Sequence, residues 1–211
     1  IMGLADSGVL GDWRGLFAAC KTIYNLGSPL TVCRKEAAKL LASYGLPDSQ
    51  SRSQSLYVEV VSEFEALMQV VTVISRLGLL FDLDRVKELL SSSQNADGSF
   101  GSGGRSRLAS TFCVTEICRV LDWRPAFLEK TTAFLRYRET IWSVAFIEDV
   151  FWLSRGLANL GQGLGYGDKA VAFALDCERG RGGFSRGTVM GIRTLEDTYY
   201  GVSILKATGY L

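Results

Sequence analysis

A repeated helical pattern constrains this 211-residue chain more than any other feature. Five segments align without gaps when their last residues are matched: GLFAACKTIYNLG (15–27), ALMQVVTVISRLG (66–78), STFCVTEICRVLD (110–122), DVFWLSRGLANLG (149–161) and DTYYGVSILKATG (197–209). The step from one segment end to the next ranges from 39 to 51 residues. Periods of this size are typical of stacked helical pairs. The sequence therefore predicts a helical repeat protein.

Each segment has the pattern of a buried helix. The third residue is large and the ninth is apolar in all five, and four of them end in glycine. Apolar residues at helical spacing followed by glycine predict a buried helix with a glycine C-cap. The third positions are Phe17, Met68, Phe112, Phe151 and Tyr199, and the ninth are Ile23, Ile74, Cys118, Leu157 and Leu205. We expect most of these side chains in the core.

More polar helices are expected between these segments, in ranges 28–45, 82–93, 124–139 and 165–178. Their charges fall on one face, as in a helix that is solvated on one side. No stretch of useful length shows the period-two alternation of strands. The fold class is therefore all-α, with helical hairpins whose more apolar helices face inward. A Ser/Gln-rich stretch at 49–55 is predicted to be an exposed loop within a single domain that spans 1–211.

Composition excludes several functions and locations. A formal net charge of +1 lacks the basic footprint of nucleic-acid binding, so we expect no nucleic-acid partner. No apolar run of about 18 residues is present, which predicts no transmembrane segment. The N-terminus lacks a secretory signal, and five scattered cysteines favour reduced thiols, so we expect a cytoplasmic protein. The start at Ile1 suggests that further residues precede it.

The absence of histidine restricts the chemistry further. It excludes Ser-His-Asp and Cys-His nucleophiles and every histidine-based metal site. Catalysis would depend on carboxylates, tyrosine, cysteine, lysine or arginine. The glycine-rich strings GSGG (101–104) and GQGLGYG (161–167) follow no predicted strand, and no Gly-Lys-Ser/Thr is present. Neither string is therefore predicted to bind a nucleotide.

Two glycine–phenylalanine loops precede predicted apolar helices: QNADGSFG (94–101), and GGFSR (182–186) followed by LEDTYYGVSIL (195–205). They resemble the Gln-x-x-Asp-Gly-Ser-aromatic and Gly-Gly-Phe…Asp-x-x-Tyr repeats of the prenyltransferase and squalene-cyclase (terpenoid cyclase) family, nearest to protein prenyltransferase β subunits. The resemblance implies an α/α toroid in which each loop joins an outer helix to an inner one. About five inner helices are visible here, so the ring is expected to be incomplete.

The same resemblance implies an isoprenoid-handling enzyme, a prenyl transferase or terpene cyclase that binds a prenyl diphosphate or an apolar polyene in the lumen. Both signature motifs of the family are incomplete. Asp149 and Asp197 match the zinc-binding aspartate, but Phe151 and Tyr199 stand in the cysteine position. The nearest string to the cyclase acid motif, DLDR (82–85), lacks the final aspartate. We therefore expect no metal or other cofactor, with zinc or magnesium as the alternative.

Acidic pairs at the starts of two predicted inner helices are the candidate catalytic residues: Glu148, Asp149, Glu196 and Asp197. Carboxylates brought close together acquire different pKa values, as general acid–base catalysis requires. The alternative is that they cap the helices and interact with the helix dipole.

Aromatic and arginine side chains are the candidate substrate-binding residues: Phe112, Phe151, Trp152, Tyr199, Tyr200, Arg186 and Arg193. The aromatic side chains could line an apolar lumen and stabilise an allylic cation, the alternative being core packing. The arginines match the basic residues that precede the family's aspartate and could hold a diphosphate, the alternative being solvated loop charges.

Two other functions remain open from the sequence. One is a catalytically inert toroid that serves as a ligand-binding or protein-interaction module. The other is a carbohydrate-active α/α barrel with paired carboxylates. Because the terminal inner helices are not polar on all sides, an open arc would expose apolar faces. We expect contact between the first and last repeats, a homodimer, or an N-terminal hairpin before Ile1.

Overall fold

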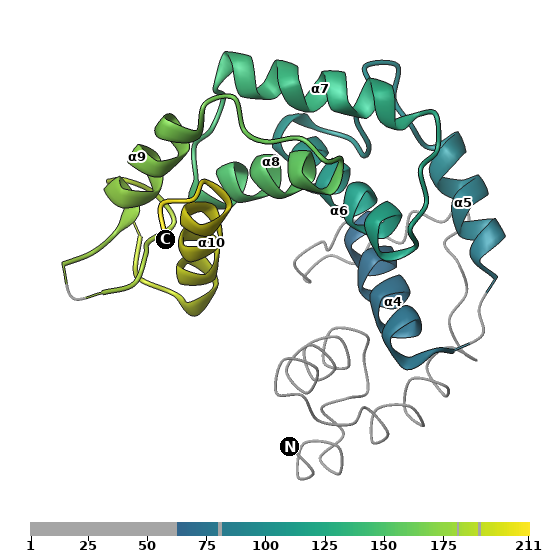
Figure 1. The fold of residues 1–211 in the computed structure, drawn as a ribbon, viewed down its shortest axis with the longest axis horizontal. Coiled ribbons are helices and arrows are strands. Elements are labelled where there is room, and N and C mark those ends of the chain that lie inside the picture. The colour runs from purple at the N-terminus through teal and green to yellow at the C-terminus, as the bar shows by residue number, and fades with distance from the viewer. Residues whose placement is uncertain (1–62, 80–81, 181, 190) are drawn as a thin grey trace, which may run out of the picture. The chain divides into compact units, whose positions relative to one another are not determined.

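The computed structural model describes residues 63–79, 82–180, 182–189 and 191–211 (Figure 1). The regular elements in these ranges are α4 (Glu63–Leu77), α5 (Leu83–Ser92), α6 (Gly104–Val120), α7 (Leu128–Ile141), α8 (Ile147–Asn159), α9 (Gly167–Cys177) and α10 (Leu195–Ala207). Extended pairing within them is limited to two isolated bridges. The all-α prediction is confirmed for the described part of the chain. The predictions for 15–27, 28–45 and 49–55 lie outside it.

The chain divides into two compact units. The N-terminal unit comprises Ile1–Leu89 and Val120–Trp123, and the C-terminal unit comprises Leu90–Arg119 and Arg124–Leu211. The described part of the N-terminal unit includes α4, which buries residues such as Leu67 and Val70. Every candidate site residue lies in the C-terminal unit. Closure into a toroid and a single domain over 1–211 stay predictions.

The predicted helix ends are confirmed in the four aligned segments that the structure describes. Each ends on a residue with left-handed backbone, with φ of 59° at Gly78, 48° at Asp122, 74° at Gly161 and 73° at Gly209. After each of the three glycines, the next backbone N–H donates to a carbonyl of the last turn: Leu79 to Ile74, Gln162 to Leu157, and Tyr210 to Leu205. This is the Schellman arrangement, which satisfies carbonyls that the helix leaves unpaired.

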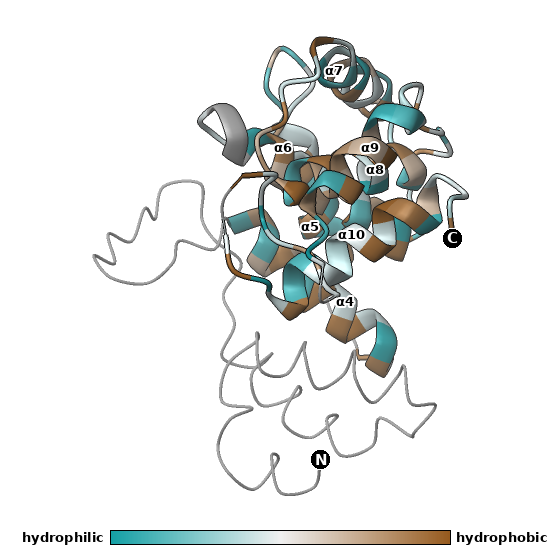
Figure 2. Cartoon of the chain, turned by 90° about the vertical axis from the view of Figure 1, so that its left-hand side faces the viewer, coloured by the Kyte–Doolittle hydropathy of each residue, from teal (hydrophilic) through white to brown (hydrophobic). Residues whose placement is uncertain are grey.

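Helix α8 lies at the centre of the C-terminal unit, where it packs against α7, α9 and α10, while α10 also packs against α9. The largest core cluster comprises Ile147, Val150, Phe151, Ala170, Ala174, Cys177, Phe184, Ile204 and Leu205. A second cluster, Leu108, Phe134, Leu135, Leu153 and Leu157, joins α6, α7 and α8. The ninth positions of the three segments in this unit are all buried. Figure 2 shows hydrophobic and hydrophilic stretches on single helices, as amphipathic packing requires.

The loop QNADGSFG ties the start of α7 to α6. Gln94 Nε2 donates to the carbonyls of Gly98 and Phe127 at 3.2 and 3.0 Å and to Thr131 Oγ1 at 3.0 Å. The Phe100 side chain is fully buried, with its ring edge-on to Phe127 at 5.5 Å between centroids. The polar residues of the motif thus hold the loop, and its phenylalanine enters the core.

A threonine hydroxyl accepts the backbone N–H of each loop phenylalanine. Phe100 N–H donates to Thr111 Oγ1 at 3.0 Å, and Phe184 N–H donates to Thr198 Oγ1 at 3.1 Å. In turn the two hydroxyls donate to carbonyls one helical turn back. The ring of Phe184 occupies the space that a side chain at Gly201 would need. The two loops that the sequence relates are therefore joined to their helices by the same contact.

Replacing Thr111 by valine tests this contact. The substitution removes the acceptor of a buried N–H, so we expect the free energy of unfolding to fall by about 1–3 kcal/mol. Thr140→Val is the matched control, because the exposed Thr140 hydroxyl makes the same helical bond, to Arg136, and accepts no loop N–H. Urea unfolding followed by circular dichroism measures both. Equal losses in the two variants would contradict the proposed role of Thr111.

A second substitution tests the turn itself. Gly98 has a φ of 88°, and a Cβ there would collide with the backbone carbonyl of Lys130. Gly98→Ala should therefore lower the free energy of unfolding by more than about 1 kcal/mol. Gly163→Ala should be neutral or slightly stabilising, since Gly163 has no neighbour within 4 Å and lies outside the left-handed region. Thermal melting distinguishes them, and a stable Gly98→Ala variant would show that the loop can shift.

Candidate functional site

Four of the five predicted aromatic residues form one cluster. Phe151 on α8 lies 5.6 Å from Phe112 on α6, and 5.6 and 4.6 Å from Tyr199 and Tyr200 on α10, measured between ring centroids. Phe151 is 5% exposed, whereas Tyr199 is 48% exposed. We call these four side chains the aromatic cluster. It extends from the core to the surface and connects three helices that carry the aligned segments.

Trp152 lies outside this cluster. Its partly buried side chain packs against both hydrophobic core clusters of the C-terminal unit. The structure therefore gives Trp152 a packing role.

Of the four predicted acids, Glu196 is the one that is exposed and in contact with the aromatic cluster. Tyr200 Oη donates to Glu196 Oε1 at 2.6 Å. The two residues are four apart on α10, a spacing that places them on one helix face. The bond fixes a carboxylate beside the rings.

Asp149 caps α8, and Asp197 supports the N-cap of α10, which is Thr194. Asp149 is buried, and its Oδ2 accepts the backbone N–H groups of Ala145 and Phe146 at 2.9 and 3.0 Å. At α10 the Asp197 N–H donates to Thr194 Oγ1 at 2.9 Å, and that hydroxyl donates to Asp197 Oδ2 at 2.7 Å. Such bonds satisfy N–H groups and add negative charge at the positive end of the helix dipole. The geometry of both aspartates fits the capping alternative.

Glu148 and Arg186 form an ion pair that links the start of α8 to the loop that precedes α10. Arg186 Nε donates to the buried Glu148 Oε1 at 2.7 Å, and the guanidinium lies over the Phe146 ring at 4.4 Å. The backbone carbonyl of Arg186 also accepts the N–H of Ile147 at 2.8 Å. No described residue accepts a hydrogen bond from the two Nη groups of Arg186, whose side chain is 52% exposed.

Arg193 lies on the same hairpin as Arg186. An isolated bridge pairs Arg193 with Ser185, and its Nη1 donates to the Gly182 carbonyl at 3.0 Å. Arg179, a further loop arginine, donates to the carbonyls of Gly187 and Thr188 at 2.8 and 3.0 Å. The hairpin is thus held by arginine–carbonyl bonds, while Arg186 and Arg193 stay accessible to an anion.

Metal ligation finds little support in the described ranges. Within 63–79, 82–180, 182–189 and 191–211, no group of three or more Cys, Asp or Glu side chains could hold a metal ion. Burial raises the pKa of Cys177 to about 11 and that of Cys118 to about 12, so both thiols are protonated at neutral pH. The expectation of no cofactor stays a prediction. None of the described helices is long and apolar enough to span a bilayer.

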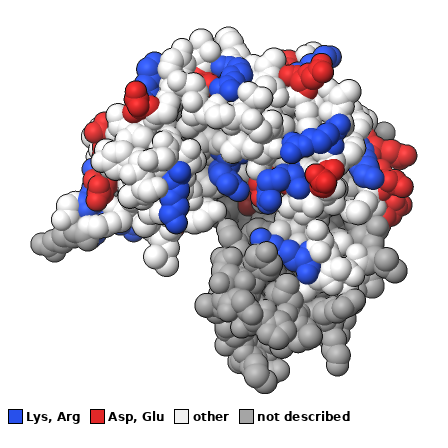
Figure 3. All heavy atoms as spheres, viewed as in Figure 1, with Lys and Arg blue, Asp and Glu red and all other residues white. Residues whose placement is uncertain are grey.

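Surface charge is mixed on the face that Figure 3 shows, with basic side chains separated by acidic and uncharged ones.

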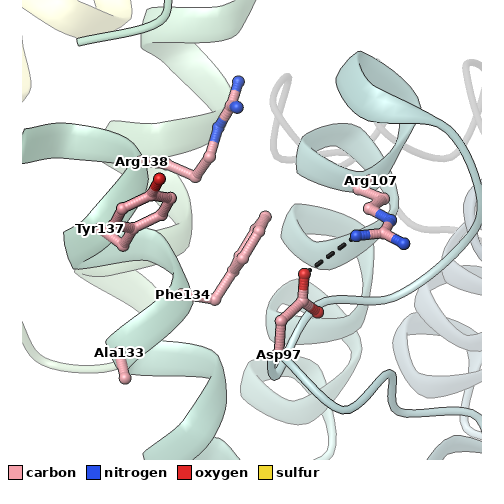
Figure 4. Close-up of a pocket in the computed structure, with 6 residues that line it drawn as sticks. All are labelled: Asp97, Arg107, Ala133, Phe134, Tyr137 and Arg138. Carbon is pink, nitrogen blue, oxygen red and sulfur yellow. Dashed lines mark hydrogen bonds and ion pairs between the residues drawn. The ribbon is translucent and has the colours of Figure 1, made fainter. Parts of the chain in front are cut away.

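The structure also contains a pocket that the sequence did not predict. Its lining includes Phe134, Tyr137 and Arg138 of α7 (Figure 4). Tyr137 and Arg138 follow Phe134 by three and four residues, so each lies beside Phe134 on the helix surface. This spacing is the sequence signal that could have grouped the three residues.

In the comparisons with known proteins, no protein-family model matches the chain and no curated protein matches it. The proposals below therefore depend on the motif resemblance and on the geometry of the C-terminal unit.

The capping role of Asp149 can be measured directly. Asp149→Ala should lower the free energy of unfolding by about 1–2 kcal/mol, and Asp149→Asn by less, because asparagine keeps one acceptor oxygen. Asp168→Ala is the control, since Asp168 lies exposed in the first turn of α9. Denaturant titrations of all three give the comparison. A loss for Asp149→Ala no larger than that for the control would exclude the cap as a source of stability.

Proposed function

We propose that this protein is an isoprenoid-handling enzyme of the prenyltransferase or terpene-cyclase type. The supporting observation is the aromatic cluster, in which Phe112, Phe151, Tyr199 and Tyr200 from three helices meet and reach the surface. A branched apolar chain gains contact area on such rings, and ring faces stabilise a carbocation through cation–π attraction. The cluster is the substrate-binding surface in this proposal.

The remaining groups of the site lie at the starts of the same helices. Glu196 and Tyr199 lie in the first two turns of α10, and Arg193 directly precedes that helix. Phe151 occupies the corresponding part of α8, whose start Arg186 contacts. Both arginines offer positive charge and N–H donors that can hold a diphosphate. An apolar chain on the rings would therefore have its diphosphate near Arg186 and Arg193.

The proposed reaction starts when the carbon–oxygen bond to the diphosphate breaks. The diphosphate leaves with the electron pair, and the allylic cation is stabilised by the aromatic cluster. A nucleophile of the acceptor, or a double bond of the same polyene, then attacks the cation. The proton released passes to a base, for which Glu196 is placed by its bond to Tyr200. Asp149 and Asp197 position the helices.

One alternative has an observation in its favour. Because Asp149 caps α8 and Asp197 holds the N-cap Thr194, a catalytically inert module that binds an apolar ligand on the same rings fits the geometry. The carbohydrate-active alternative fits less well. Paired carboxylates would need to reach a sugar together, whereas Glu148 and the two aspartates are buried.

Binding of a fluorescently labelled farnesyl diphosphate tests the proposal. Tyr199→Ala should weaken binding about fivefold to tenfold, because it removes an aromatic contact of roughly 1 kcal/mol or more. Tyr210→Ala, a change at another exposed tyrosine, should leave affinity unchanged. Arg193→Gln should weaken the binding of the labelled diphosphate and leave the binding of labelled farnesol unchanged. If the wild-type protein does not bind the probe, the proposal fails.

Turnover separates the enzyme from the inert module. Product formation from farnesyl diphosphate, with and without magnesium, is followed by chromatography. Glu196→Gln keeps an acceptor for Tyr200 and should bind the probe normally but lose turnover. Saturable binding by the wild-type protein with no product under any condition would support the inert alternative.

A further inference from the structure

A separate hollow of about 400 Å³ lies in the C-terminal unit between the QNADGSFG loop, the start of α6 and α7. Its lining residues are Asp97, Arg107, Ala133, Phe134, Tyr137 and Arg138, none of which belongs to the aromatic cluster. A volume of this size is within the range of small-molecule sites. Figure 4 shows Arg107 projecting from α6 toward the face of α7 that carries Phe134 and Tyr137.

The charges of this hollow do not balance. Arg107 Nη1 is paired with Asp97 Oδ2 at 2.9 Å, and none of the other described lining residues is a carboxylate that could pair with Arg138. Asp97 is fixed in place because its Oδ1 accepts the N–H and the hydroxyl of Ser99 at 3.1 and 2.6 Å. These bonds, that of the Ser99 hydroxyl above all, hold the pKa of Asp97 below its usual range. The described lining residues, Asp97, Arg107 and Arg138, therefore carry one net positive charge at neutral pH.

Hydrogen-bond donors in the hollow remain unused. The Arg107 Nη2 has no acceptor among the described residues. Arg138 donates one bond, from Nη2 to the Ser143 carbonyl at 3.2 Å. The hydroxyl of Tyr137, an exposed residue, also has no described partner. An oxyanion in the hollow would accept hydrogen bonds from Arg107 Nη2, from Arg138 and from the Tyr137 hydroxyl.

An apolar surface accompanies these donors. Phe134 is mostly buried in the core cluster, and Figure 4 shows its ring standing between Arg107 and the Tyr137–Arg138 side of α7. A flat group can stack on such a ring and on guanidinium planes, while the guanidinium N–H groups bind oxygen atoms in pairs. Charge, donors and apolar surface together define one ligand chemistry.

We propose that this hollow binds a small organic anion in which a phosphate or carboxylate group is attached to a flat apolar body. The oxyanion is held by Arg107 and Arg138 with help from Tyr137, and the body lies against Phe134. Asp97 acts as a positioning residue that orients the Arg107 guanidinium through their ion pair. The site shares no residue with the proposed isoprenoid site, so either proposal can fail without the other.

Calorimetric titration of the full chain at low salt tests this site with four probes. Phenyl phosphate carries a phosphate group and benzoate carries a carboxylate. The probe that binds more tightly shows which of the two groups the site prefers. Benzyl alcohol lacks the charge and inorganic phosphate lacks the apolar body. Each of these two controls should bind at least about tenfold more weakly than the preferred anion. Equal affinity for inorganic phosphate would contradict the role of Phe134.

Variants assign the binding to named residues. Arg138→Gln should lower the affinity for the preferred anion by about tenfold or more, since it removes a charged donor. Arg85→Gln, which removes an exposed arginine on α5, should have no effect. Phe134→Leu keeps an apolar side chain for the core. It should weaken the binding of phenyl phosphate more than the binding of inorganic phosphate. Thermal melting confirms that each variant is folded. No saturable binding of either anion, or unchanged affinity in Arg138→Gln, would overturn the proposal.

Discussion

The arrangement of the C-terminal unit depends on how a loop phenylalanine is buried. A phenylalanine that enters the core takes its backbone N–H with it, and that group needs an acceptor. Thr111 and Thr198 supply it, and both hydroxyls also donate to their own helices. Each contact joins a glycine-containing turn to the first turns of the helix that follows. It thereby fixes where α6 and α10 begin relative to the loops that precede them.

The helix starts determine which side chains are available for chemistry. At α8 and α10 the same Glu-Asp dipeptide stands in the first turn. Asp149 caps α8 directly, and Asp197 accepts the hydroxyl of Thr194, the N-cap of α10. The two glutamates differ, because Glu148 is buried against Arg186 whereas Glu196 is exposed and bonded to Tyr200. The aromatic cluster lies beside these starts. The proposed chemistry therefore depends on Glu196 and on rings that the capped helices hold in place.

Much of this could be predicted from local pattern. The helices, their glycine ends and the buried ninth positions follow from apolar spacing, and Phe112, Phe151 and Tyr199 meet because they share one position of the repeat. Contacts between distant residues could not be predicted in this way. The pair Glu148–Arg186 spans 38 residues, and no periodicity distinguishes its glutamate from Glu196. The hollow at Arg107 likewise requires α6 and α7 to be placed in space.

If an isoprenoid chain lies on the aromatic cluster, intermolecular nuclear Overhauser effects between the chain and the rings will report it. The protein, labelled with ¹³C in its aromatic side chains, is mixed with farnesyl diphosphate, and contacts are recorded between the prenyl methyl groups and ring protons. The account predicts contacts to Tyr199 and Tyr200, with Phe112 and Phe151 next, and none to Tyr210. Contacts confined to Phe134 and Tyr137, or to rings outside the cluster, would contradict it.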